Sequence, residues 1–247
     1  MNDLLELKCS LNRIINIAAI KKYAIFKPID GKPYNLNIWV VRSNTQHAGK
    51  FDDIMCVFYH DGRINRFDTY PITADPSDLS LMTMKNKLGC AVAKPGQYRA
   101  AYQFGKHNGK YEALVQNRPI TVIRDYNRDA VLDVELNSYF RVHEYTVGSS
   151  KVIDYYDDNN KLMFRENVGV FGCNIHRASA WKILESVGLY SEGCIVHQNP
   201  YKYNDFIDTV KKSMKYWGDR FTVTLITEWQ LDSVSNNNIS KTMINRA

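Results

Sequence analysis

The sequence predicts a mainly β protein, a β-sandwich or barrel, with an amphipathic helix at its N-terminus and a helix after the Cys194 segment. Short runs of β-branched and aromatic residues recur through the middle of the chain, and Gly, Asn, Asp or Pro bounds each run. Helical periodicity is confined to the first 22 residues and to the C-terminal third. With 45% hydrophobic residues, 23% charged residues and no low-complexity tract, the composition excludes disordered, collagen-like and disulfide-scaffold classes.

The N-terminal segment 3–22 carries apolar residues at intervals of three and four, which places them on one helical face: Leu4, Leu7, Leu11, Ile14 and Ala18. We therefore expect one amphipathic helix over this range. Basic residues outside the apolar stripe favour a weak contact with a membrane surface or a partner, but Asp3 and Glu6 dilute their charge. Packing against the main domain is the preferred interpretation.

The middle of the chain is predicted to form strands, and Asp61-Gly62 is expected to form a hairpin turn between two of them. Turn residues separate the runs, and strands at this frequency predict a sandwich or barrel. The expected strands are 36–43, 53–61, 63–73, 97–105, 111–117, 119–126, 130–136, 138–147 and the hairpin of 151–156 with 161–167.

The C-terminal third returns to helical spacing at 178–188 and 203–217, and the run 221–227 is expected to form a closing strand. Residues 232–247 are polar and Asn-rich, which predicts a loose tail. No linker or internal repeat divides the rest. We therefore expect an N-terminal helix and connector over 1–34, one main domain over 35–231 and a tail over 232–247.

Charge and hydropathy exclude several partners. The chain carries 32 Lys and Arg against 26 Asp and Glu, a net charge of +6 spread along the sequence, so no nucleic-acid partner is expected. No uninterrupted apolar stretch approaches the roughly 18 residues of a membrane-spanning helix. The N-terminus MNDLLELKCS is acidic where a signal peptide is basic, so we expect no signal peptide and synthesis in the cytoplasm.

The five cysteines are an odd number without framework spacing, which predicts free thiols. Cys9, Cys56 and Cys90 lie among apolar or small neighbours and are interpreted as inert core residues. Cys194 differs because it lies in the segment 172–199, which holds a second cysteine and two of the six histidines. Chemistry is therefore expected in this segment.

Cys194 is the candidate nucleophile and His176, eighteen positions upstream, is the candidate base. A thiol becomes a good nucleophile when a neighbouring base takes its proton and backbone N–H groups receive the oxyanion. Gly193 allows a sharp turn and a close approach of the backbone to a substrate carbonyl. Ser191 is placed to hydrogen-bond across the same turn.

These residues resemble the signature of the L,D-transpeptidase (YkuD-like) catalytic family. In that family a histidine is followed, after some fifteen variable residues, by Ser/Thr-His-Gly-Cys, an apolar residue and Asn or Arg. The matching residues here are His176, Ser191, Gly193, Cys194 and Ile195. The segment KPGQYRAAYQF from Lys94 is similar to a second family segment, and the resemblance covers roughly residues 35–230 in order of elements. It implies an L,D-transpeptidase-like fold with a catalytic domain over 35–231.

Two positions depart from the family pattern. The family histidine before Gly-Cys is Glu192 here, and the family Asn or Arg is Val196. A carboxylate beside the thiol disfavours the thiolate, although it can also bind an amine of the substrate. Val196 removes a hydrogen-bonding group from the site.

The resemblance implies that Cys194 attacks a carbonyl of a peptidoglycan stem peptide and forms a thioester, with His176 as general base and then general acid. No cofactor is implied. An amine acceptor gives a cross-link, and water gives an L,D-carboxypeptidase or endopeptidase. Without an export signal, hydrolytic use at the cell wall is favoured, by a protein released at lysis or carried in a phage particle.

Two alternatives stay open. The sequence contains two C-x2-H pairs, Cys173 with His176 and Cys194 with His197. Together these four residues could supply tetrahedral zinc ligands. The departures Glu192 and Val196 are also compatible with a binding or virion structural module that keeps the fold but has a degenerate site. If His197 is not a zinc ligand, it is interpreted as a surface histidine in the loop before Pro200.

Overall fold

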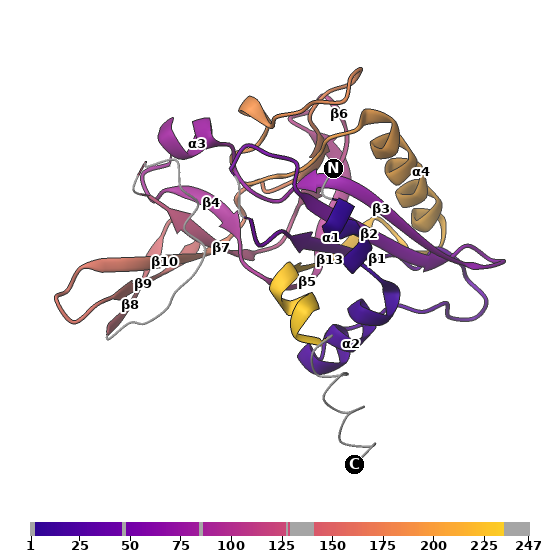
Figure 1. The fold of residues 1–247 in the computed structure, drawn as a ribbon, viewed down its shortest axis with the longest axis horizontal. Helices are drawn as coiled ribbons and strands as arrows, with labels where there is room; N and C mark the ends of the chain where they lie inside the picture. Colours follow the sequence, from indigo (N-terminus) through magenta and orange to yellow (C-terminus); the bar gives the residue numbers. More distant parts are fainter. Residues whose placement is uncertain (1–2, 46–47, 84–85, 127, 129–140, 235–247) are drawn as a thin grey trace, which may run out of the picture.

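A computed structural model describes residues 3–45, 48–83, 86–126, 128 and 141–234. The protein is mainly β, as predicted, with a closed barrel and a second five-stranded sheet that extends to one side of it (Figure 1). The strands of the barrel, in spatial order, are β1 (Asn37–Arg42), β13 (Arg220–Thr227), β5 (Gly96–His107), β6 (Tyr111–Gln116), β11 (Ile175–Arg177), β12 (Ile195–His197), β3 (Asn65–Thr73) and β2 (Asp53–His60).

The second sheet is antiparallel. Its strands, in spatial order, are β4 (Cys90–Ala93), β7 (Ile120–Asp125), β10 (Leu162–Gly169), β9 (Ser150–Tyr156) and β8 (Arg141–Val147). Among the described residues, β4 is its first strand and β8 its last. The strand expected at 130–136 lies outside the described residues. The strands expected by period-two patterning elsewhere are present, with shifts of a few residues at their ends.

Two of the neighbouring strand pairs in the closed barrel are parallel, β1 with β13 and β11 with β12. Ile38 and Val40 of β1 point into the barrel, where they join a core that includes Leu225 of β13. The intervening Trp39 and Val41 are also buried, because helices cover the outer face of this strand. A strand buried on both faces reads as a continuous apolar run, which explains the segment NIWVVR.

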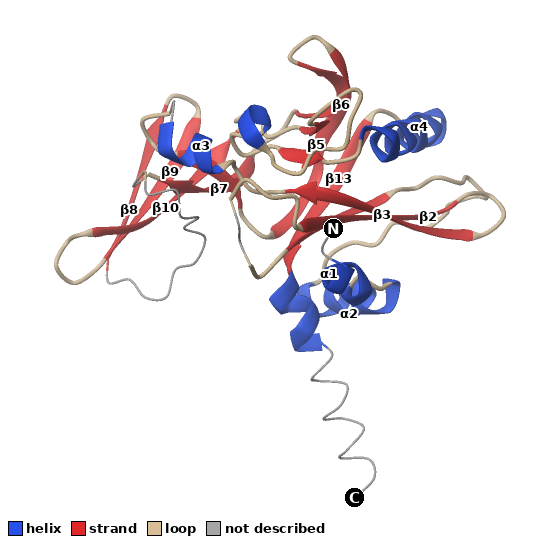
Figure 2. Cartoon of the chain, turned by 45° about the horizontal axis from the view of Figure 1, so that its top comes forward, coloured by secondary structure: helices blue, strands red, loops and turns tan. Residues whose placement is uncertain are grey.

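The N-terminal segment forms two helices, α1 (Asp3–Lys8) and α2 (Leu11–Lys21), so the prediction of one helix over 3–22 is wrong. The chain breaks at Ser10, whose hydroxyl caps α2 by accepting from the Arg13 N–H at 3.4 Å. The break rotates α1, so Leu4 and Leu7 are exposed while Leu5 is buried. Packing of both helices against the outer face of β1 and β2 is as expected (Figure 2).

Residues 228–234 are helical and pack beside α2, so the tail predicted from 232 begins too early. Leu231 and Val234 are buried in the same apolar cluster as Ile14. The Lys8 ammonium holds this helix through Glu228 at 2.6 Å and Asp232 at 3.0 Å. The remainder of the predicted tail, 235–247, lies outside the described residues.

The segment 178–188 does not form the helix that its spacing predicts, and only the short 3-10 turn η1 (Gly188–Tyr190) follows it. Its apolar residues do not share one helical face: Trp181 is 85% exposed, whereas Ala178 and Val187 are buried in a small apolar cluster. Its backbone is tied to other elements instead, since the Val187 N–H donates to Gly49 O at 2.8 Å and the Leu184 carbonyl accepts from Gln198 at 2.7 Å. Tertiary hydrogen bonds therefore outweigh helix propensity here.

The remaining helices are α3 (Asp78–Thr83) and α4 (Pro200–Trp217). The helix predicted at 203–217 is present as α4, and Asn199 begins it by accepting from the N–H groups of Tyr201 and Lys202. Its apolar face, including Phe206 and Val210, joins the barrel core. A helix therefore follows the Cys194 segment, as expected.

His197 is buried inside this core, so the expectation of a surface histidine is wrong. Its ring packs 5.0 Å from Tyr203, 5.2 Å from Phe206 and 5.5 Å from Tyr70, measured between ring centroids. Neither ring nitrogen has a hydrogen-bond partner in the part of the chain that the structure describes. Burial, and then the charge of His176, lower the pKa of His197 to about 3.

We predict that replacing His197 with Phe reduces the loss of stability on acidification. The folded-state pKa of about 3 lies below the model value of 6.5, so the unfolded chain binds the proton first. This histidine therefore contributes stability above pH 6.5 that is progressively lost as the pH falls towards 3, about 2 kcal/mol of it by pH 5. Urea unfolding of the wild type and His197→Phe at pH 7 and pH 5 measures the difference.

The matched control is His143→Gln, since His143 is exposed on β8. This variant is expected to lose as much stability between pH 7 and pH 5 as the wild type. Equal losses in the wild type and His197→Phe would contradict the prediction.

Candidate active site

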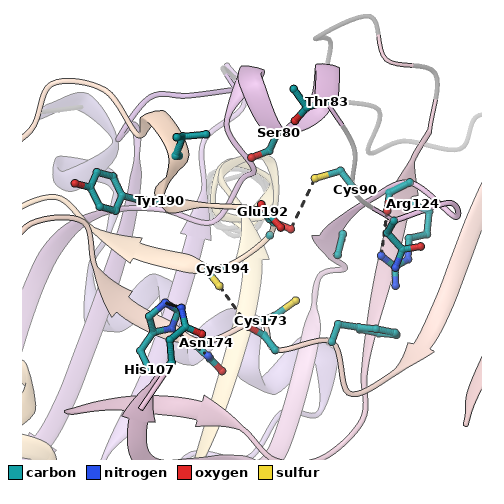
Figure 3. A pocket seen from close by; sticks show the side chains of 18 of the residues that line it. Ser80, Thr83, Cys90, His107, Arg124, Cys173, Asn174, Tyr190, Glu192 and Cys194 are labelled. Carbon is teal, nitrogen blue, oxygen red and sulfur yellow. Dashed lines mark hydrogen bonds between the residues drawn. The ribbon is translucent and has the colours of Figure 1, made fainter. Parts of the chain in front are cut away.

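A cavity of about 830 Å³ lies where the barrel meets the second sheet. Cys194 is on its wall, with His107 on one side of the view and Arg124 on the other (Figure 3). Three parts of the chain contribute most of the lining: β4 with the neighbouring β7, the connection 170–174 after β10, and the segment 189–194 that leads into β12. Residues remote in the sequence therefore surround the thiol.

The pairing of β11 with β12 places Cys194 and His176 on the same face of two neighbouring strands. Ile175 is paired with Ile195, and both point into the barrel core. Cys194 precedes Ile195 and His176 follows Ile175, so both point to the opposite face. The two side chains that the sequence singles out are thus offset by two positions along this ladder.

Tyr111 and the Arg177 carbonyl orient the His176 ring. Nδ1 lies 3.1 Å from the Tyr111 hydroxyl and 3.0 Å from the Arg177 carbonyl oxygen. A carbonyl only accepts, so Nδ1 carries the proton and Nε2 keeps its lone pair. Nε2 is buried, and no well-aligned hydrogen bond reaches it from the described residues, although a backbone contact with Tyr190 acts to raise the pKa of the ring. This is the tautomer that a general base requires.

His107 stacks on His176, with 3.9 Å between ring centroids and 17° between ring planes. Burial, and then the charge of His107, lower the pKa of His176 to about 4. His176 is therefore neutral at pH 7. Sequence reasoning missed both His107 and Tyr111, because they lie on β5 and β6 and no motif connects them to His176.

The Cys194 thiol is protonated in the resting site. Its Sγ donates to the Gly172 carbonyl oxygen at 3.4 Å. Burial raises the pKa of Cys194 to about 11; the Asn174 backbone N–H opposes this effect and the charge of Glu192 adds to it. The resting pair of Cys194 and His176 is therefore neutral.

The turn before Cys194 requires glycine at position 193. Gly193 has φ of +118°, and a Cβ added there would overlap the Ala91 carbonyl oxygen of β4. The Gly193 N–H donates to the Ser191 hydroxyl at 3.3 Å, so this N–H is engaged within the turn. The same hydroxyl lies 3.0 Å from the Cys194 carbonyl oxygen and bridges the turn.

The segment 73–80 supports this turn from behind. The Ser191 carbonyl accepts from the Ser77 N–H at 3.0 Å and from the Ser80 hydroxyl at 2.9 Å. The Ser191 hydroxyl lies 2.9 Å from the carbonyl oxygen of Asp75, whose carboxylate pairs with Arg42 at 2.7 Å. Ser191 is fully buried, so these contacts hold the nucleophile in place.

The two departures from the family pattern lie in different surroundings. Glu192 is exposed and lines the cavity. Its backbone carbonyl accepts a hydrogen bond from the Cys90 thiol at 3.7 Å. Val196 is buried in an apolar cluster with Phe51, Ala178 and Val187. A polar side chain at 196 would have to enter this cluster, so the valine suits its packing.

The proposed zinc ligands do not converge. Cys173 and Cys194 both line the cavity, but His197 packs among core aromatics and lies on the opposite face of the ladder from His176. Within the described ranges, no group of three or more His, Cys, Asp or Glu residues is placed to hold a metal ion. The strand alternation therefore overturns the zinc hypothesis.

Comparisons with protein-family models, with curated proteins and with solved structures give no match. Among the described residues, no helix combines the length and apolarity needed to cross a membrane.

We predict that Gly193→Ala lowers the free energy of unfolding by more than about 3 kcal/mol, since a Cβ meets the Ala91 backbone in a left-handed conformation. Gly109→Ala is the matched control: its φ is +72°, but a Cβ there meets nothing within 4 Å, so we expect a loss of about 1 kcal/mol. Urea unfolding measures both, and similar losses would show that the contact with Ala91 is not restrictive.

Proposed function

We propose that this protein is a cysteine acyltransferase of the L,D-transpeptidase type that acts on peptidoglycan stem peptides and uses water as the second acceptor. One observation carries the proposal: Cys194 and His176 lie on one face of a two-strand ladder, and Cys194 lines a cavity large enough for a peptide. The family resemblance of the segment 176–195 supplies the substrate class.

The first half of the reaction starts when Sγ turns from the Gly172 carbonyl towards the substrate carbonyl carbon. The thiol proton passes to His176 Nε2 as the sulfur–carbon bond forms. The tetrahedral intermediate then collapses to a thioester, and the protonated Nε2 gives its proton to the leaving amine. Tyr111 and the Arg177 carbonyl keep Nδ1 protonated throughout, so the ring stays aligned.

The two pKa values determine the timing of proton transfer. With a thiol pKa of about 11 and an imidazole pKa of about 4, a preformed thiolate–imidazolium pair is present in only about one molecule in ten million. Proton transfer must therefore accompany bond formation. This differs from cysteine enzymes in which a resting ion pair supplies the nucleophile.

The second half of the reaction needs an acceptor for the thioester. Glu192 lines the cavity two positions before Cys194, and a carboxylate at this place can take a proton from an attacking water. Hydrolysis regenerates the thiol and releases the trimmed peptide. We therefore favour carboxypeptidase or endopeptidase activity over cross-linking.

A binding or virion structural module is the second candidate, and a specific observation favours it. The resting Cys194 thiol donates to Gly172 rather than to His176, and its pKa is raised rather than lowered. An inactive relic of the family would keep the same fold. Thiol chemistry and substrate turnover separate the two candidates.

We predict that the purified protein releases a terminal D-amino acid from muropeptides and that Cys194→Ala and His176→Ala each reduce the rate at least about a thousandfold. Tyr111→Phe keeps the ring but removes the hydroxyl at 3.1 Å from Nδ1, so a smaller loss, about tenfold, is expected. Mass spectrometry of muropeptides distinguishes trimming, cross-linking and inactivity. Cys56→Ala, at a buried thiol remote from the cavity, is the control.

We also predict a pH signature for acylation of Cys194 by p-nitrophenyl acetate, followed by nitrophenolate release. With the pKa of His176 at about 4, the base is already neutral from pH 6 to 9, so the wild-type rate should be nearly constant. In His176→Ala only thiolate reacts, and its fraction rises about tenfold per pH unit below the thiol pKa of about 11. After subtraction of the Cys194→Ala background, equal slopes would favour the binding module.

A further inference from the structure

We propose that Arg124 binds a carboxylate of the ligand in the Cys194 cavity, so that the site selects peptides with a free carboxylate close to the carbonyl that is attacked. The inference rests on the proposed function, because it names a specificity determinant of the same site. It stands on the position and surroundings of one guanidinium.

Arg124 is a buried cation on the wall of the cavity. It lies on β7, is 4% exposed and lines the same cavity as Cys194, in the part of the view away from His107 (Figure 3). Desolvation of a charged group is costly unless an opposite charge compensates for it. The identity of its partners therefore decides whether Arg124 has a structural or a binding role.

The partners of Arg124 are all neutral. Its Nε and Nη2 donate to the Asn167 side-chain oxygen at 3.2 and 2.7 Å, and its Nη1 donates to the Gly89 carbonyl at 3.1 Å. Its guanidinium carbon lies 4.6 Å from the Phe171 ring centroid. Among the described residues, no carboxylate lies within 4.0 Å of it, and these contacts engage only three of its five N–H groups.

Among the described residues, buried Arg42 and half-buried Arg165 are each paired with a carboxylate. Arg42 is 1% exposed and lies 2.7 Å from Asp75, and Arg165 makes two contacts with Asp154 at 2.5 and 2.7 Å. Arg124 departs from this pattern at the one cavity that holds the candidate nucleophile. Remaining N–H groups on a planar guanidinium match a carboxylate in geometry and charge.

The register of the second sheet places Arg124 next to the nucleophile turn. Arg124 is paired with Ala91 across β7 and β4, and the Ala91 carbonyl is the group that excludes a Cβ at Gly193. Directly paired residues have Cβ atoms about 5 Å apart. The Asn167 amide donates to the Lys151 carbonyl at 2.7 Å, which holds its oxygen towards the guanidinium. The cation is thus positioned before any ligand arrives.

Glu192 determines the direction in which a ligand lies. Its carboxylate belongs to the exposed part of the cavity lining, where it repels an incoming carboxylate. Arg124, at the buried part of the lining, attracts one. A peptide therefore places its carboxylate inward and any amine towards Glu192.

Alkylation of Cys194 by two matched reagents tests the inference without peptidoglycan. Iodoacetylglycine carries a carboxylate and iodoacetylglycinamide does not, while their reactive carbons are alike. Rates at Cys194 are measured by peptide mass spectrometry and corrected with a free thiol. The wild type is expected to react about tenfold faster with the carboxylate reagent than with the amide reagent. This preference should disappear in Arg124→Gln and partly return in Arg124→Lys. The control variant Arg66→Gln should show the wild-type preference.

Equal ratios in the wild type and Arg124→Gln would overturn the inference. Loss of the preference in Arg66→Gln would also overturn it, because Arg66 is exposed on β3 and paired with Asp61. Binding of acetyl-D-alanine and its carboxamide to Cys194→Ala, followed by NMR titration, gives a second readout that needs no reactive thiol. A carboxylate preference without muropeptide turnover would retain the anion site and reject the proposed enzyme.

Discussion

The buried ion pair of Arg42 and Asp75 is the interaction on which the nucleophile region depends. Arg42 belongs to β1 of the barrel, and its guanidinium also donates to the carbonyls of Ala74 at 3.2 Å and Ala93 at 2.9 Å. One side chain thereby joins the barrel, the segment after β3 and the first strand of the second sheet. The backbone of Asp75 in turn contacts Ser191, so the ion pair reaches the Cys194 turn through two hydrogen bonds. Removal of either charge would leave the other buried and unpaired.

Strand alternation explains why one short ladder can serve both packing and chemistry. In β11 and β12 the inward positions hold Ile175 and Ile195, which complete the barrel core. The position between the inward ones holds His176 in β11, and Cys194, just before β12, lies on the same face. The same alternation places His197 inward, where it is surrounded by aromatic rings. The strand register therefore gives His176 and His197, which lie on the same ladder, different surroundings.

The sequence predicts the β class and most strands, because period-two patterning and turn residues are local signals. It fails at 178–188, where helical spacing competes with hydrogen bonds to Gly49 and Gln198, and at Ser10, where one cap divides a helix. The candidates Cys194 and His176 are visible in a local motif. Tyr111, His107 and Arg124 carry no such signal, since only the pairing of strands brings Tyr111 to His176 and brings His107 and Arg124 to the cavity.

The contact between Gly193 and Ala91 joins these observations. It is a backbone-to-backbone approach, so it holds the barrel against the second sheet without depending on a side-chain rotamer. Cys194 follows Gly193 directly, and Arg124 is the cross-strand neighbour of Ala91. Each added atom at position 193 would separate the thiol from the guanidinium. The glycine at position 193 therefore also influences the distance between the Cys194 thiol and the buried Arg124 guanidinium.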